Sequence, residues 1–123
     1  MSKIKIEWAK PIRVLELEAP DGMTDVLSVE VAFEDEYEAA TVRDIAADAM
    51  RKIKGAVVDA TGMRAHPTVR ASFPGGLIAP RWLAKMSRRV QQAIRDVDYG
   101  EFIEVRRVTY AEQKAAREGG RDR

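Results

Sequence analysis

VLSVEVAFE, at residues 26–34, is the stretch with the most regular alternation of apolar and polar or small residues in this chain. Successive side chains of a β-strand point to opposite faces, so the alternation predicts a strand with one buried and one solvated face. Upstream, residues 12–18 are rich in valine and leucine, and the turn-forming sequence APDG follows at residues 19–22. We therefore expect these two strands to form an antiparallel hairpin.

Downstream of the hairpin, the sequence favours a helix. Thr41 and Asp44 resemble a capping box, and apolar residues then recur at helical spacing to about Thr61. The sequence leaves two possible positions for the C-terminal end of this helix. Gly55 costs about 1 kcal/mol relative to alanine inside a helix and favours an early end, whereas Gly62 favours a late one.

The second half of the chain predicts a strand, a helix and a strand. Residues 68–73 alternate, Pro80 suits the first turn of a helix that continues to about residue 97, and residues 102–110 favour a last strand. The fold class is therefore α+β in the order β-β-α-β-α-β, a mixed or antiparallel sheet with two helices on one face. An extra edge strand at residues 3–8 stays open. We expect residues 1–110 to form a single domain and residues 111–123 a polar, mobile tail.

Composition narrows the class of protein. The chain has 123 residues, of which 46% are hydrophobic and 33% charged, as in globular proteins. It contains no cysteine, which excludes disulfides and thiolate chemistry. The first residues lack the apolar stretch of a signal peptide, and no apolar run reaches the ~18 residues that span a bilayer. These features predict a cytoplasmic protein without a membrane partner.

The charges are unevenly divided along the chain. Residues 1–60 carry 8 basic and 13 acidic side chains, whereas residues 61–123 carry 13 basic and 7 acidic ones. No lysine or arginine occurs from Val14 to Val42, and no acid occurs from Arg64 to Arg95. This separation favours a partner that is recognised by its charge. The alternative is that the two segments neutralise each other within one molecule.

The predicted second helix carries a basic stripe. Its polar residues recur at spacings of 4, 3, 4 and 3, which places them on one face, and no acid precedes Asp96 to relieve the repulsion between like charges. The residues of the stripe, with Arg89 at its margin, are Arg81, Lys85, Arg88, Gln92 and Arg95. An acidic run in the first half is complementary in charge. Its residues are Glu34, Asp35, Glu36 and Glu38.

Two kinds of partner suit the basic stripe. One is an acidic protein surface, including the acidic run of a second copy of this chain. This predicts a non-enzymatic interaction or assembly module, such as a virion-assembly or host-interaction protein of a phage or mobile element. The alternative is a small RNA- or DNA-binding protein that adds Arg70, Trp82, Arg106 and Arg107 to the stripe. Against the alternative, the net charge is only +1 and no helix-turn-helix, RRM or KH signature is present.

Catalytic and cofactor sites are not indicated by the sequence. His66 is the single histidine, and its position before Pro67 suits a turn. Gly75 and Gly76 lie outside any complete phosphate-binding motif, and the acidic run is typical of a solvated surface rather than a metal site. The sequence therefore predicts no enzyme, no cofactor and no metal.

Overall fold

The computed structural model describes residues 10–18, 24–63, 66–73, 80–109 and 111–112. Two helices and five strands make up the main elements of this part of the chain. In chain order they are β1 (Ile12–Glu18), β2 (Thr24–Val31), α1 (Glu36–Arg51), β3 (Val57–Met63), β4 (His66–Ser72), α2 (Pro80–Arg95) and, after the 3-10 turn η1 (Gly100–Phe102), β5 (Ile103–Thr109).

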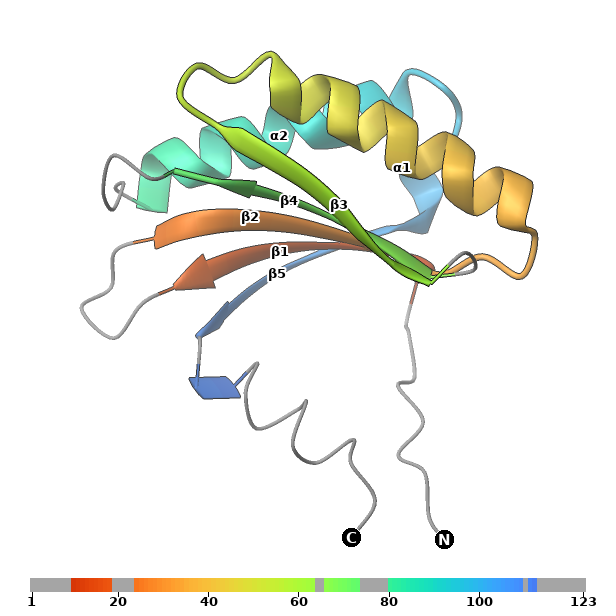
Figure 1. The fold of residues 1–123 in the computed structure, drawn as a ribbon, viewed down its shortest axis with the longest axis horizontal. Helices are drawn as coiled ribbons and strands as arrows, with labels where there is room; N and C mark the ends of the chain where they lie inside the picture. Colours follow the sequence, from red (N-terminus) through yellow and green to blue (C-terminus); the bar gives the residue numbers. More distant parts are fainter. Residues whose placement is uncertain (1–9, 19–23, 64–65, 74–79, 110, 113–123) are drawn as a thin grey trace, which may run out of the picture.

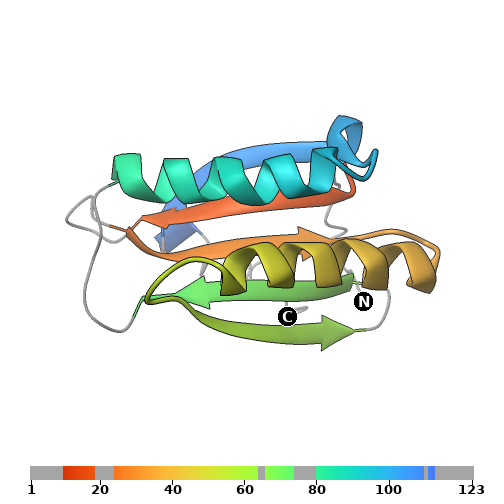
Figure 2. The same ribbon diagram turned by 90° about the horizontal axis from the view of Figure 1, so that it is seen from above.

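The strands form one mixed sheet in the order β3-β4-β2-β1-β5. Neighbouring strands are antiparallel except β1 and β5, which run parallel. Both helices lie on the same face of the sheet, side by side (Figures 1 and 2). The predicted α+β class and the placement of both helices on one face are confirmed, and of the two sheet types left open, mixed or antiparallel, the structure has the mixed one.

The predicted hairpin is confirmed as the pair of β1 and β2. Val14 lies opposite Val29, and Ile12 lies opposite Val31, so these four apolar side chains share the face under the helices. These four side chains are fully buried. The alternation seen in the sequence therefore marks the side of the sheet on which the core forms.

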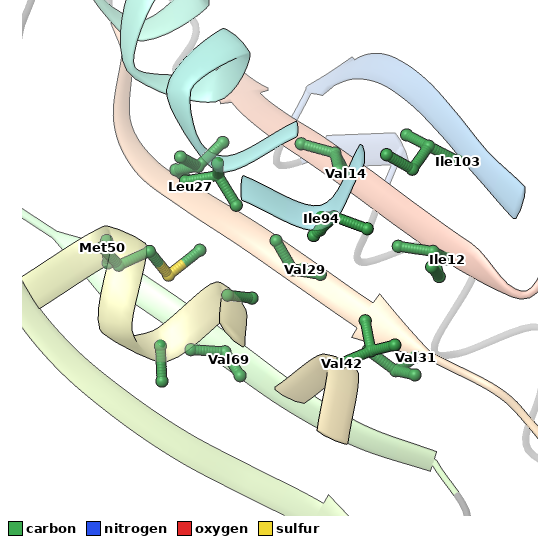
Figure 3. Packing of buried hydrophobic residues seen from close by; sticks show 14 of the residues in the cluster. Ile12, Val14, Leu27, Val29, Val31, Val42, Met50, Val69, Ile94 and Ile103 are labelled. Atoms are coloured by element: carbon green, nitrogen blue, oxygen red, sulfur yellow. The ribbon is translucent and has the colours of Figure 1, made fainter. Parts of the chain in front are cut away.

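The core fills the space between the sheet and the helices (Figure 3). Val42 and Met50 of α1 and Ile94 of α2 are fully buried against the valines and leucines of the sheet. At about 25 cal/mol per Å² of apolar surface, such burial is the main stabilising contribution to a fold of this size.

The first helix begins earlier than the sequence predicts. Asp35 is its N-cap, and the Asp35 carboxylate accepts a hydrogen bond from the Tyr37 backbone N–H at 2.7 Å. Thr41 instead lies inside α1, where its hydroxyl donates to the Tyr37 carbonyl at 2.8 Å. The true cap is stronger because aspartate adds a negative charge at the helix N-terminus.

The helix also ends earlier, and the order of elements gains a strand. The chain leaves α1 at Arg51, and Gly55 adopts a φ of 86°, which residues with a side chain rarely adopt. Residues predicted as a helical continuation then form β3, which pairs with β4. Val57 and Val58 are β-branched and favour a strand, and the pairing with β4 satisfies their backbone groups.

The face of the sheet opposite the helices is called the helix-free face below. Strand pairing places alternate residues of all five strands on it. Its residues with described side chains are Arg13, Leu15, Leu17, Val26, Ser28, Glu30, Val57, Asp59, Thr68, Arg70, Ser72, Glu104, Arg106 and Val108.

Several sequence-based expectations lie outside the described residues. These are the extra edge strand at residues 3–8, the glycines of residues 75–76, and the tail from residue 113 onward. Among the helices that are described, none has the length and apolar character required to cross a membrane.

Candidate functional site

The outer face of α2 carries the basic stripe. Leu83, Val90 and Ile94 are fully buried and face the core, and Ser87 and Gln91 are buried on the same side of the helix. All the residues predicted for the stripe are exposed, namely Arg81, Lys85, Arg88, Arg89, Gln92 and Arg95. Trp82 beside them is 50% exposed, with the Lys85 ammonium 5.2 Å from its ring centroid.

The cations of α2 have no carboxylate partner among the residues that the structure describes. The ion pairs found there involve other arginines, on β1, α1 and β5. The stripe makes two side-chain hydrogen bonds within α2 and just after it: the Arg95 guanidinium donates to the Gln91 amide oxygen, and the Gln92 amide donates to the Asp96 carboxylate. The predicted partner of the stripe, an acidic protein surface or a second copy of the chain, stays a prediction.

The acidic run has a structural role at the start of α1. Asp35 is the N-cap, and Glu36 and Glu38 lie in the first turn, where negative charge interacts favourably with the helix dipole. Glu34 precedes them and is exposed. A contribution of these residues to partner binding stays a prediction, because helix capping alone accounts for their position.

The other three arginines proposed for nucleic-acid contacts do not share one surface. Arg70 and Arg106 belong to one row across the helix-free face, with Ser28 and Leu15 between them. Arg107 points to the opposite face, where its guanidinium lies 3.3 Å from the Glu16 carboxylate. Strand pairing places Arg70 and Arg106 on the helix-free face, whereas α2 lies on the other face of the sheet (Figure 1).

The outer edge of β3 is the feature that the sequence analysis missed. Within the described residues, β3 pairs with β4 alone and forms one edge of the sheet. Alternate residues of an edge strand direct their backbone N–H and C=O groups outward, where another strand can bind them. Val57 is 54% exposed on this strand, and Asp59 and Ala60 are also exposed.

The two edges of the sheet differ in charge. The seven residues of β5 include Glu104, Arg106 and Arg107, and charged side chains on an edge strand discourage the addition of another strand. The seven residues of β3 include one charged side chain, Asp59. The β3 edge is therefore the more open of the two to strand addition.

The signal for this edge was present but ambiguous in the sequence. Val57, Val58 and Thr61 are β-branched, and Gly55 precedes them, as expected of a strand after a breaker. Valines and alanines at these positions also fit the helical spacing of α1. Only the pairing with β4, which is non-local information, decides between the two.

Comparison with known proteins finds similarity at the level of solved structures only. No family model and no curated protein matches the chain. The ribosomal processing protease Prp from S. aureus has been solved with a covalently linked product peptide. That structure is 16% identical to this chain, covers 79% of it and 99% of its own length, and has a TM-score of 0.43.

Two further structures are similar. The same protease with a substrate peptide is 14% identical, with 79% of this chain and 99% of that chain covered and a TM-score of 0.39. SMU.848 from Streptococcus mutans is 10% identical, with 80% and 97% covered and a TM-score of 0.41. At these values the likeness concerns the α+β fold alone.

These structures correct the functional predictions from sequence. Prp is an enzyme, and its structures contradict the predictions of a non-enzymatic assembly module, a viral protein and a nucleic-acid-binding protein, as well as the prediction that the chain is not an enzyme. Charge patterning was an insufficient basis for those predictions, because it describes a surface and not a reaction. The activity of Prp is not transferred to this chain.

Proposed function

We propose that the chain binds an extended polypeptide segment by strand addition to the outer edge of β3. The observation that carries the proposal concerns β3, which within the described part of the chain has no strand on its outer side and carries a single charged residue, whereas the β5 edge of the sheet carries three. In strand addition, backbone hydrogen bonds supply affinity, and alternate side chains of the added strand supply specificity.

The side chains of β3 define the preferred sequence of the added segment. Val57 and Asp59 lie two residues apart and therefore on the same face of the sheet. An apolar residue beside Val57 extends a row that continues through Ser72, Val26 and Leu17. A lysine or arginine beside Asp59 forms an opposite-charge pair, which contributes about 0.2–1 kcal/mol. The favoured segment has an apolar and a basic residue two positions apart.

Peptide selection tests the proposal. The labelled full chain is applied to an array of random peptides about eight residues long, and the affinity of the selected peptides is then measured for two lysine variants. Val57→Lys introduces a charge on the β3 edge, and we expect about tenfold weaker binding, equivalent to about 1.4 kcal/mol. Val105→Lys is the matched control, because Val105 is a 41% exposed valine on the β5 edge.

A charge reversal tests the specificity. Asp59→Lys is expected to shift the selected peptides from basic to acidic residues at the position beside residue 59. Backbone amide resonances of β3 should change most when peptide is added. Recovery of no binding peptide, or equal loss of binding in Val57→Lys and Val105→Lys, would show that the β3 edge is not the binding site.

A further inference from the structure

The helix-free face has an apolar centre that is buried. Leu15 is 4% exposed and Leu17 is 0% exposed, yet neither belongs to the hydrophobic core between the sheet and the helices. Both lie on β1, an inner strand between β2 and β5, and Val26 and Val108 flank Leu17 on these neighbouring strands. An apolar surface thus lies behind the sheet as well as in front of it.

A polar group is buried with these leucines. Ser28 is fully buried on the same face, opposite Leu15, and its hydroxyl has no hydrogen-bond partner among the described residues. A hydroxyl on an open, solvated sheet face would be hydrated. Its burial shows that the face is covered and not open to water.

The cover belongs to this chain and not to α1 or α2. Both helices lie on the other face of the sheet (Figures 1 and 2), and the burial is present in a single copy of the chain. Two terminal segments outside the described residues are long enough to cover it, residues 1–9 and residues 113–123.

The chemistry of the two segments distinguishes them. Residues 113–123 contain two alanines and no larger apolar residue. Residues 1–9 contain Ile4, Ile6 and Trp8 at alternate positions. Alternation of this kind places the apolar side chains on one side of an extended segment, as covering an apolar face requires.

The length and the attachment of residues 1–9 suit this position. Nine extended residues span roughly 30 Å, more than the roughly 23 Å of the seven residues of β1. The described chain begins with a bend at Lys10 and Pro11. The Pro11 carbonyl accepts a hydrogen bond from the Ala32 N–H at 2.6 Å, which holds the bend against the end of β2.

We propose that residues 1–9, the N-terminal segment, fold back at Lys10 and Pro11 and dock on the helix-free face, with Ile4, Ile6 and Trp8 against Leu15 and Leu17. The site is independent of the β3 edge, and the segment acts as an intramolecular cover of the sheet. This placement is an alternative to the extra edge strand that the sequence left open at residues 3–8. It uses the alternation of Ile4, Ile6 and Trp8 to cover an apolar face.

Tryptophan fluorescence tests the proposal on the full chain. The chain has two tryptophans, and Trp82 is half exposed on α2. The variant Trp82→Phe therefore reports on Trp8 alone. Docking predicts that its emission lies at shorter wavelength than in urea-unfolded protein, and that acrylamide quenches it less than in the unfolded chain.

Two further variants in the same background test the alternation. Ile6→Ser removes an apolar contact and should shift Trp8 emission to longer wavelength and increase quenching. Lys5→Ser changes the neighbouring, outward position and should leave both unchanged. Far-UV circular dichroism confirms that the sheet and helices persist in each variant.

Three results would overturn the proposal. The first is a Trp8 that is quenched in the folded protein as strongly as in urea. The second is an equal response of Ile6→Ser and Lys5→Ser. The third is protection of Trp8 that is lost on dilution, which would assign the cover to a second copy of the chain.

Discussion

Adjacent residues of a strand have different environments, as Arg106 and Arg107 of β5 illustrate. Arg106 is exposed on the helix-free face. Arg107 lies on the opposite face, where its guanidinium pairs with Glu16, a carboxylate whose side chain is only 9% exposed. Loss of a partner from a buried carboxylate leaves a desolvated charge, whereas loss of an exposed arginine changes little.

This difference predicts unequal effects of two alanine substitutions. Arg107→Ala should lower the free energy of unfolding by about 1 kcal/mol, a value below that for fully buried pairs because Arg107 is 45% exposed. Arg106→Ala is the matched control and should change it by less than about 0.5 kcal/mol. Urea unfolding measures both. Equal effects would show that the pair of Arg107 with Glu16 contributes nothing measurable.

At the level of elements, sequence periodicity predicted the strands and helices whose own residue pattern is sufficient to identify them. The alternation of residues 26–34 predicted β2, and the apolar spacing of α2 predicted both its buried and its basic faces. Periodicity could not separate β3 from the end of α1, because Val57, Val58 and Ala60 fit both patterns. The candidate binding edge was therefore missed. An edge strand is one that has a neighbouring strand on one side only. This depends on the order of the strands in the sheet, which the sequence of a single segment does not contain.

The basic stripe of α2 has a measurable effect on helix stability. Its first turn contains Arg81 and no acid, although the helix dipole favours negative charge there. Arg81→Glu should raise the free energy of unfolding by about 0.5 kcal/mol, since it also removes repulsion with Lys85. Arg95→Glu, at the C-terminal end of the same stripe, should lower it by a similar amount.

Salt provides the control for this pair. Both side chains are exposed, so salt should screen their interactions. As the ionic strength rises from about 0.01 M to about 1 M, where the Debye length falls to about 3 Å, the two opposite changes in the free energy of unfolding should both become smaller. Changes of the same sign for Arg81→Glu and Arg95→Glu, or changes insensitive to salt, would contradict the electrostatic explanation.

At the level of the whole molecule, the sheet joins the two ends of the described chain. β1 is the first described strand and β5 the last, and they lie side by side and parallel (Figure 2). The hairpin of β1 and β2 needs only a short turn, whereas the pairing of β1 with β5 closes a loop that includes both helices. Long loops are closed late in folding because their entropy cost precedes the contacts that offset it.

This order predicts different kinetic effects in β5 and β2. Ile103→Val, in β5, costs about 1 kcal/mol and should raise the unfolding rate about fivefold with little change in the folding rate. Val29→Ala, in the central strand β2, should slow folding instead. Stopped-flow unfolding and refolding in urea measure both rates. Slower folding of Ile103→Val would place β5 in the transition state.

The parallel pair also has a consequence for biosynthesis. While the polypeptide is still being translated, β1 and β2 can associate long before β5 has been made, so the flank of β1 that β5 will occupy stays available to other molecules. Nascent chains with an unpaired flank of this kind aggregate readily. We therefore expect newly made copies of this protein to depend on chaperones until the last strand emerges.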